Sequence, residues 1–288
     1  MKGIFICLVL AAQIANSFAQ PKKDTKLQHQ IEALIKGFNG EIGVYVKDIR
    51  KNKIVEINAD SIFPTASMVK IPILIGVIDK MERGELNYEQ ELIYKDSLLY
   101  EGVDILGSFK EGEKIELGKV MMLMLTMSDN TASLWLQSLA GTGTRINHIL
   151  DSIGFQITRV NSRTPGREND RTLFGWGQTT PREMGTLMEK ICTKQLFSDS
   201  ASTRMMRVLS RNYWDQHAIS RIPPTTQVFS KNGAVDASRS EVLFVNAPRR
   251  PYVFCVTTKK NKDESWTPGN EAWKLTEKIS ALLWDHFN

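Results

Sequence analysis

Three short motifs occur in a fixed order along this chain, and they constrain its fold and chemistry more than any other feature. Ser67 and Lys70 stand three residues apart, Ser128-Asp129-Asn130 forms a second motif, and Lys231-Asn232-Gly233 forms a third. A Ser-x-x-Lys pair alone is expected about once by chance in a chain of this size, given ordinary usage of serine and lysine. The ordered set is far rarer, and it indicates one site to which three distant segments contribute.

Residues 1–19 have the pattern of an export signal. An apolar run follows Lys2, and the small residues Ser17 and Ala19 fit cleavage after Ala19. The run is too short for a mature membrane-spanning anchor, although an uncleaved anchor is the alternative. We therefore expect a periplasmic or secreted protein without a stable membrane anchor. Its mature part, residues 20–288, is expected to be a single catalytic domain and a monomer.

Composition excludes several classes of function. The hydrophobic fraction of 42% supports a substantial core, and the net charge of +5 is mild and spread along the chain, without the basic and aromatic stripe of a nucleic-acid binder. The four histidines are scattered without the spacing of a metal site, so we expect neither metal nor cofactor. Cys192 and Cys255 each lie in an apolar segment; the sequence leaves their pairing open, and we favour two buried free thiols.

Hydrophobic periodicity predicts strands near both ends of the mature chain. Residues 24–38 have apolar positions at helical spacing, and residues 41–50 and 53–59 alternate as the strands of a hairpin. The later predicted elements are strands at 226–230, 240–246 and 252–258 and a last helix at 270–287. The two ends are therefore expected to form one sheet.

The segment between these strands is mostly helical. Residues 116–127 and 131–140 form apolar helices, and a capping box at Thr180, with Pro181 and Glu183, opens a helix that reaches about Gln195. We predict an α/β two-lobed fold, in which an antiparallel sheet flanked by terminal helices carries an inserted all-α lobe. The α/β lobe spans about 24–62 and 215–288, and the all-α lobe spans about 63–214.

The first motif suits nucleophilic catalysis. Ser67 and Lys70 share one face of a helix that is predicted to begin near Ser67, where the positive end of the helix dipole favours an alkoxide-like oxygen. A serine hydroxyl needs a base, and a lysine among apolar residues and other cations can lose its proton and serve as one. The alternative is an N-capping serine followed by a surface lysine.

The second motif lies in a predicted turn between two helices. Ser128 would relay a proton to the leaving nitrogen, Asn130 would offer its amide to a substrate carbonyl, and Asp129 would hold the turn. The alternative is a plain helix cap, a position that Asp and Asn favour.

The third motif follows the predicted strand 226–230. Lys231 would attract a substrate carboxylate, and Gly233 would let the substrate backbone approach closely. The backbone N–H groups of Ala234 and Ser67 would form an oxyanion hole. The alternative is a β-turn lysine at a strand end.

Together these motifs and the two-lobed pattern resemble the class A β-lactamases and their penicillin-binding relatives, over nearly all of the mature chain. Residues 63–70 are similar to the nucleophile segment of that family, and residues 126–132 match its second motif closely. The third motif departs from the family, which usually has Ser or Thr where this chain has Asn232. Asn232 can still hydrogen-bond a carboxylate, with a longer and differently shaped group.

The sharper departure lies at residues 161–181. The family carries an Arg-x-Glu there, followed by an Asn, and these hold the water that releases the acyl-enzyme. Counting from Arg163, the glutamate position falls on Pro165, and the nearby Glu168 is displaced by about three residues. Two interpretations remain open: either the loop realigns so that Glu168 is the base, or Glu168 belongs to a solvated, charge-paired loop between Arg167 and Arg171.

The resemblance implies an exported class A-type serine β-lactamase whose substrate is a small-molecule β-lactam. Its catalytic residues would be Ser67, Lys70 and Ser128, with Glu168 as the candidate base for deacylation. An alternative hypothesis is a D-alanyl peptidase acting on cell-wall peptide, or another serine hydrolase with poor deacylation. A third is a non-catalytic cell-wall binder that retains the fold.

Overall fold

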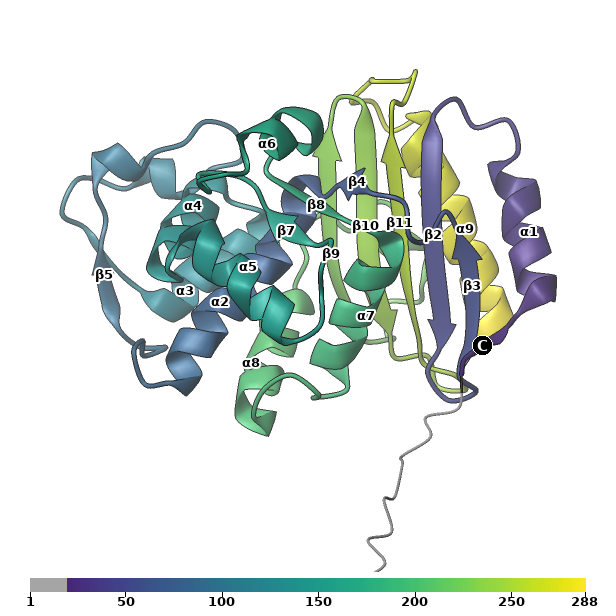
Figure 1. Ribbon diagram of the computed structural model, residues 1–288, viewed down its shortest axis with the longest axis horizontal. Helices are drawn as coiled ribbons and strands as arrows, with labels where there is room; N and C mark the ends of the chain where they lie inside the picture. Colours follow the sequence, from purple (N-terminus) through teal and green to yellow (C-terminus); the bar gives the residue numbers. More distant parts are fainter. Residues whose placement is uncertain (1–19) are drawn as a thin grey trace, which may run out of the picture.

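The computed structural model describes residues 20–288, so the signal peptide expected at residues 1–19 lies outside the described residues. A sheet with helices on both faces occupies one side of the molecule, and a mostly helical part occupies the other (Figure 1). Within residues 20–288, no helix combines the length and the apolar character that crossing a membrane requires.

The main sheet of the described part has six strands, in the spatial order β1-β3-β2-β11-β10-β9. Its strands are β1 Lys22–Lys23, β2 Glu41–Asp48, β3 Lys53–Ile57, β9 Val228–Val235, β10 Ser238–Val245 and β11 Tyr252–Lys259. All neighbours are antiparallel except β1, which pairs with β3 in parallel and was not predicted because two lysines carry no strand pattern. The β2–β11 pairing, with Tyr45 opposite Cys255, joins the two ends of the chain as predicted.

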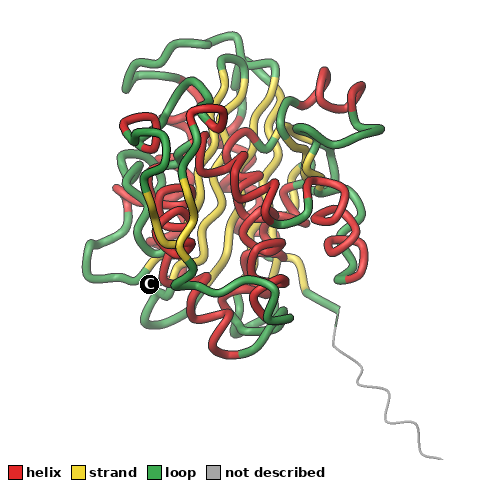
Figure 2. Tube along the Cα trace, turned by 90° about the vertical axis from the view of Figure 1, so that its left-hand side faces the viewer, coloured by secondary structure: helices red, strands yellow, loops and turns green. Residues whose placement is uncertain are grey.

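Helices cover both faces of this sheet, as Figure 2 shows from the side. On one face α1 (Thr25–Ile35) and α9 (Glu271–Phe287) pack on the sheet through an apolar cluster that includes Ile31, Leu243 and Ile279. On the other face α7 (Pro181–Cys192) packs on β10 and β11. All eight residues of β10 are buried, because alternate side chains enter the two cores.

The helical part is built around α2 (Lys70–Glu82), whose first nine residues are all buried. A helix that is apolar all round must be covered on every side, and α4, α5 and α8 surround it. The remaining helices are η1 Ala66–Val69, η2 Asp96–Leu98, η3 Leu106–Ser108, α3 Leu117–Met122, η4 Leu123–Met127, α4 Asn130–Leu139, α5 Thr142–Ser152, α6 Glu168–Phe174, α8 Asp199–Leu209 and η5 Ile219–Arg221.

This part is not purely helical, which corrects the predicted all-α lobe. Two small sheets interrupt it, with the spatial orders β4-β8-β7 and β5-β6. Their strands are β4 Phe63–Pro64, β5 Glu91–Ile93, β6 Lys114–Glu116, β7 Arg159–Val160 and β8 Gly177–Thr179. Each has only two or three residues, too few for a period-two pattern to be recognised.

Several predicted boundaries differ from the observed ones. The helix predicted at 116–127 is instead the short α3 followed by the π-helix η4. The strand predicted to end at Ser230 continues through the third motif to Val235. The N-cap at Thr180 is confirmed, since its Oγ1 accepts from the Glu183 N–H at 3.1 Å. The Glu183 carboxylate does not complete the box, because it accepts from the Ile157 N–H at 3.0 Å.

Both cysteines of the described part are free, as predicted. Cys255 is buried in β11, and Cys192, at the end of α7, is only partly buried. Burial raises the pKa of both thiols well above the ordinary value, so neither is poised as a nucleophile.

Candidate active site

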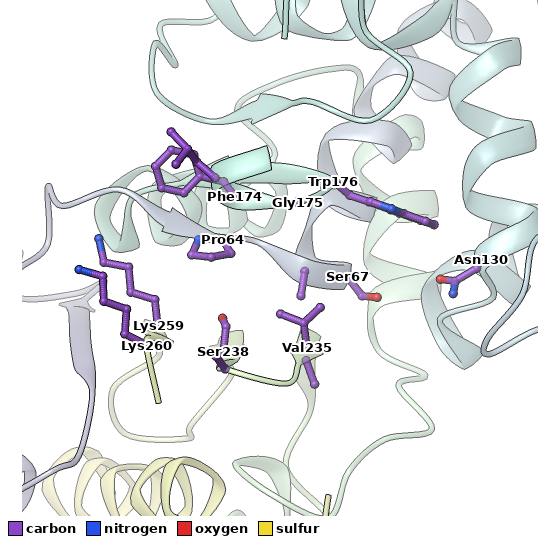
Figure 3. Close-up of a pocket in the computed structure, with 14 residues that line it drawn as sticks. Pro64, Ser67, Asn130, Phe174, Gly175, Trp176, Val235, Ser238, Lys259 and Lys260 are labelled. Atoms are coloured by element: carbon purple, nitrogen blue, oxygen red, sulfur yellow. The ribbon is translucent and has the colours of Figure 1, made fainter. Parts of the chain in front are cut away.

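Ser67 lies on the 3₁₀ helix η1, at the junction between β4 and α2. It borders a cavity of about 650 Å³, which Figure 3 shows in close-up. The preceding residue, Ala66, has a φ of 43°, a left-handed conformation that costs a non-glycine residue about 1–3 kcal/mol. The predicted helix therefore starts in strained 3₁₀ form, and Lys70 is the first residue of the α-helix proper.

The buried Lys70 amine brings the first two motifs together. Its Nζ lies 3.2 Å from Ser67 Oγ and 3.0 Å from Ser128 Oγ. It also contacts the Ser128 carbonyl at 2.6 Å and Asn130 Oδ1 at 3.0 Å. All four partners are uncharged oxygens. Lys70 is 0% exposed, so the surface-lysine alternative is wrong.

This environment lowers the pKa of Lys70 well below its ordinary value. The main cause is burial, and the charge of Lys231 adds to it, while Asp129 acts in the opposite direction. A neutral lysine amine has a lone pair that can accept the Ser67 hydroxyl proton. The geometry therefore suits Lys70 to act as a base toward Ser67.

The turn that carries Ser128 is set by an unusual helix end. The π-helix η4 ends at Met127, and the next residue, Ser128, adopts a left-handed φ of 62°. Trp214 fixes this end by donating from Nε1 to the Met127 carbonyl at 2.9 Å. Single π-helical turns often occur at functional sites. Here the turn aims both the hydroxyl and the carbonyl of Ser128 at Lys70.

Asp129 holds the turn, as the sequence predicts. Its Oδ1 accepts from the Ala132 N–H at 2.7 Å, which caps α4, and its Oδ2 accepts from the backbone N–H groups of Ile105 and Leu106 at 2.5 and 3.1 Å. The cap alternative is thus correct for Asp129. Asp129 thus also ties the turn to the loop that carries Ile105 and Leu106.

Asn130 borders the cavity, and its side chain is anchored at both ends. Its Oδ1 accepts from Lys70, and its Nδ2 donates to the Glu101 carbonyl at 3.3 Å. The amide that was expected to contact a substrate carbonyl therefore has a partner within the protein.

The third motif lies inside β9, not at the end of a strand. Lys231 is fully buried, and its Nζ donates to Asn232 O at 2.8 Å and to Asn232 Oδ1 at 3.1 Å. Burial lowers the pKa of Lys231 to about 7, opposed by the charge of Glu241, whose own pKa burial raises to about 8. The β-turn alternative for Lys231 is wrong, and the side chain of Asn232 is occupied by the neighbouring lysine.

Gly233 is needed for a reason that the sequence did not reveal. A Cβ at this position would lie 2.4 Å from the Thr65 carbonyl oxygen and 2.8 Å from the Ser67 nitrogen. The close approach is thus made by the protein's own backbone, since β9 packs directly against η1. This contact places Ala234 and Ser67 on the same cavity, where both were expected to supply oxyanion-hole N–H groups.

The structure does not bring Glu168 into this cluster. Glu168 is the first residue of α6 and is exposed, and its Oε1 accepts from the Gly166 N–H at 3.1 Å. The loop is charge-paired through Arg167, which lies 3.1 Å from Asp170, and not through Glu168. Within residues 20–288, neither Glu168 nor Pro165 lines the cavity.

The segment after Glu168 contributes apolar residues instead. Leu173, Phe174 and Trp176 line the cavity, and Trp176 packs edge-to-face on Tyr100 with ring centroids 5.1 Å apart. Lys259 and Lys260 line it as well. Sequence analysis missed all of these lining residues because none belongs to a motif. Among the cavity-lining residues of the described chain there is no aspartate or glutamate.

Ser67, which follows the left-handed Ala66, thus lies beside the buried Lys70, and Lys70 also contacts Ser128, on a fold that combines a sheet with a helical part. The model of the Beta-lactamase enzyme family matches residues 26–287, and the chain belongs to this family. The chain is 22% identical to the β-lactamase VEB-1 of Pseudomonas aeruginosa over 294 residues, covering 98% of this chain and 97% of the relative. It is 25% identical to a β-lactamase of Streptomyces fradiae, covering 95% and 90%.

Solved structures share the fold. PBP-A superposes with a TM-score of 0.83 at 22% identity, covering 93% of this chain and 98% of its own, and one such structure is an acyl-enzyme complex of a PBP-A mutant with penicillin G. A representative class A β-lactamase from Bacteroides cellulosilyticus gives a TM-score of 0.79 at 19% identity, covering 91% and 96%. The predicted fold class is confirmed.

Proposed function

We propose that this protein is an exported serine hydrolase that opens β-lactams by forming an acyl-enzyme on Ser67. The observation that carries the proposal is the contact of the buried Lys70 amine with both Ser67 and Ser128 at the wall of the cavity. Membership of the β-lactamase family supports the substrate class.

In the acylation step, Ser67 Oγ bonds to the lactam carbonyl carbon, and the ring C–N bond breaks. Lys70 takes the hydroxyl proton, and Ser128 passes a proton to the released nitrogen, as its 3.0 Å contact with Lys70 allows. The N–H groups of Ser67 and Ala234 hold the oxyanion. Lys231 and Asn232 are the groups that would attract the substrate carboxylate. Lys231 is buried and neither residue lines the cavity, so this contact requires the Asn232 side chain to turn away from Lys231. Asn130 borders the bound ring.

Release of the acyl group requires a water activated by a base within hydrogen-bond reach. The exposed position of Glu168 does not support the role of deacylation base that its sequence position suggested. The absence of acidic groups from the described cavity lining favours a second candidate, a D-alanyl peptidase-like protein that forms a long-lived acyl-enzyme with β-lactams. The acyl-enzyme formed by a PBP-A mutant with penicillin G supports this candidate by similarity of fold.

One experiment tests both candidates. The purified mature protein is mixed with a chromogenic cephalosporin, and turnover and intact mass are followed together. Steady turnover with a transient adduct is expected of a β-lactamase, whereas a stoichiometric, persistent adduct is expected of the peptidase-like protein. Ser67→Ala should lose the adduct in either case. If the wild type shows neither turnover nor adduct, both candidates are wrong.

Glu168→Gln separates the two interpretations of the loop. Loss of a general base slows its step by about a hundredfold or more. From the position of Glu168 we expect the acyl-enzyme of the variant to decay within about twofold of the wild-type rate, because an exposed side chain outside the cavity does not touch the ester. A lifetime lengthened a hundredfold would restore Glu168 as the base.

A further inference from the structure

The cavity beside Ser67 continues to a pair of lysines that the acylation chemistry does not use. Lys259 and Lys260, at the end of β11, line the same cavity as Ser67 and Asn130. In Figure 3 the two lysines lie on the far side of the cavity from Asn130, with Pro64 and Ser238 between them and Ser67.

The charges at this end do not cancel. Glu41 is the carboxylate beside the lysines, at 3.2 Å from Lys259 Nζ and 2.6 Å from Lys260 Nζ. Hydrogen bonds from Lys260 and Lys259 lower the pKa of Glu41, so it stays ionised at neutral pH. Two ammonium groups and one carboxylate leave one positive charge at the mouth of a cavity whose described lining has no acidic residue.

The two lysines differ in their exposure and in the contacts that their ammonium groups already make. Lys259 is only 23% exposed; besides Glu41, its Nζ donates to the Ile62 carbonyl at 2.9 Å and lies 4.9 Å from the Phe63 ring centre. Lys260 is 74% exposed, and its ammonium group has three N–H donors, of which the contact with Glu41 uses one. Lys260 is thus the lysine that can take a second anion.

The lining of the cavity that Ser67 shares with the lysines is largely apolar. Pro64, Leu173, Phe174 and Val235 belong to it, and Ser238 is one of its polar residues. Ala234 on β9 pairs with Arg239 on β10, and Lys259 lies on β11, the next strand along. Two inter-strand spacings of about 4.8 Å separate the oxyanion donor Ala234 from the lysine strand by roughly 10 Å.

We propose that Lys260, with Lys259 behind it, is a subsite for a carboxylate at the far end of the acyl part of the substrate. This inference rests on the proposed function and deepens it. The preferred acyl group is an apolar chain or stem that runs along the cavity past Phe174 and Val235 and ends in a carboxylate. The ligand thereby carries an anionic group at the end of the cavity where Lys260 lies, on the far side from Asn130 (Figure 3).

The test uses penicillins with glutaroyl, adipoyl and suberoyl side chains, each compared with its terminal carboxamide. Intact mass gives the acylation rate of the wild type. For the chain of matching length we expect the carboxylate to react about twofold to fivefold faster than its amide, the range of an exposed ion pair, with the preference shrinking as salt is added. Lys260→Met should abolish the preference without changing the rate of the amide. Lys262→Met, an exposed lysine close in sequence that does not line the cavity, is the matched control and should retain the preference.

A second arm separates this inference from the proposed function. Ser67→Ala cannot be acylated, so calorimetry on this variant measures the affinity for each carboxylate penicillin and its carboxamide. The carboxylate should bind about twofold to fivefold tighter than the carboxamide. The double variant with Lys260→Met should bind both equally. If the wild type forms no adduct with any penicillin, the acylation proposal fails, and the calorimetry still decides whether the subsite exists. Equal affinities at every chain length, no binding at all, or a preference that persists in Lys260→Met would overturn the subsite.

Discussion

Substituting Gly233 by alanine tests whether the contact between β9 and η1 sets the geometry of the site. The added Cβ would lie 2.4 Å from the Thr65 carbonyl oxygen and 2.8 Å from the Ser67 nitrogen. An ordinary contact between carbon and oxygen is about 3.3 Å or longer, so the strand and the helix must separate by roughly 1 Å. Both obstacles are backbone atoms, which cannot turn away as a flexible side chain would.

Two magnitudes follow from this displacement. Overpacking of this kind costs about 1–3 kcal/mol of unfolding free energy, or roughly 2–10 °C in the melting temperature of a domain of this size. A shift of about 1 Å between Ser67 and Ala234 costs on the order of a hundredfold in rate, because the oxyanion donors no longer match the attacking serine. Activity should therefore fall by much more than stability alone explains.

The assay combines thermal unfolding with the acylation rate by a penicillin, measured at a temperature where both proteins are folded. Gly269→Ala is the matched control, because a Cβ there meets only Thr267 Oγ1, at 3.8 Å, and should change neither quantity. Acylation of Gly233→Ala within twofold of the wild type, at unchanged stability, would refute the argument that this contact sets the site.

Three further predictions concern the buried cations. Lys70→Met should fold but acylate about 10²–10⁴ times more slowly, as intact mass would show, because it keeps the apolar stem and removes the base 3.2 Å from Ser67. Because burial lowers the pKa of Lys231 to about 7, Lys231 loses its charge as pH rises through that value, so calorimetry on Ser67→Ala should find penicillin affinity falling between about pH 7 and 9 by up to tenfold per unit. Glu241→Gln should move this fall to lower pH, because the charge of Glu241 raises the pKa of Lys231. Arg239→Met should lower the free energy of denaturant unfolding by about 2–4 kcal/mol, because the Arg239 guanidinium contacts the rings of Trp266 and Trp273 and donates to the carbonyls of Asp236, Ser238 and Ser265. The exposed Arg207→Met should be neutral.

The parts of the fold that were predictable are those with local signals. The capping residue at Thr180 and the alternating strands β2 and β11 are encoded in neighbouring residues, and the structure confirms them. The motif serines and Lys70 could be singled out because each motif is a short local pattern, and their roles stay predictions. Lys70 and Ser128 indeed meet at 3.0 Å.

The parts that failed depend on tertiary contacts. The π-helix before Ser128 has the composition of an ordinary apolar helix, and only the hydrogen bond from Trp214 to Met127 and the left-handed Ser128 distinguish it. Gly233 was expected to let the substrate approach, and the structure shows a close approach of the η1 backbone at this position, which no local pattern indicates. Lys259 and Lys260 resemble ordinary lysines at a strand end, and no local pattern shows that they line a cavity with Ser67.

The energetically unfavourable features of this site are backbone strain and buried amines, and we relate them to the proposed acylation step. Ala66 and Ser128 hold left-handed conformations, and Lys70 and Lys231 are buried amines without a carboxylate at hydrogen-bonding distance in the described structure. Such strain and such burial persist only where the surrounding packing enforces them. Ala66 precedes Ser67, the nucleophile of the proposed acylation, and Lys70 contacts both Ser67 and Ser128. The loop around Glu168 shows the opposite arrangement, an exposed carboxylate that accepts from its own turn at Gly166. If strain marks the step for which a site is organised, this site is organised to form the acyl-enzyme, and the lifetime of that intermediate depends on groups other than Glu168.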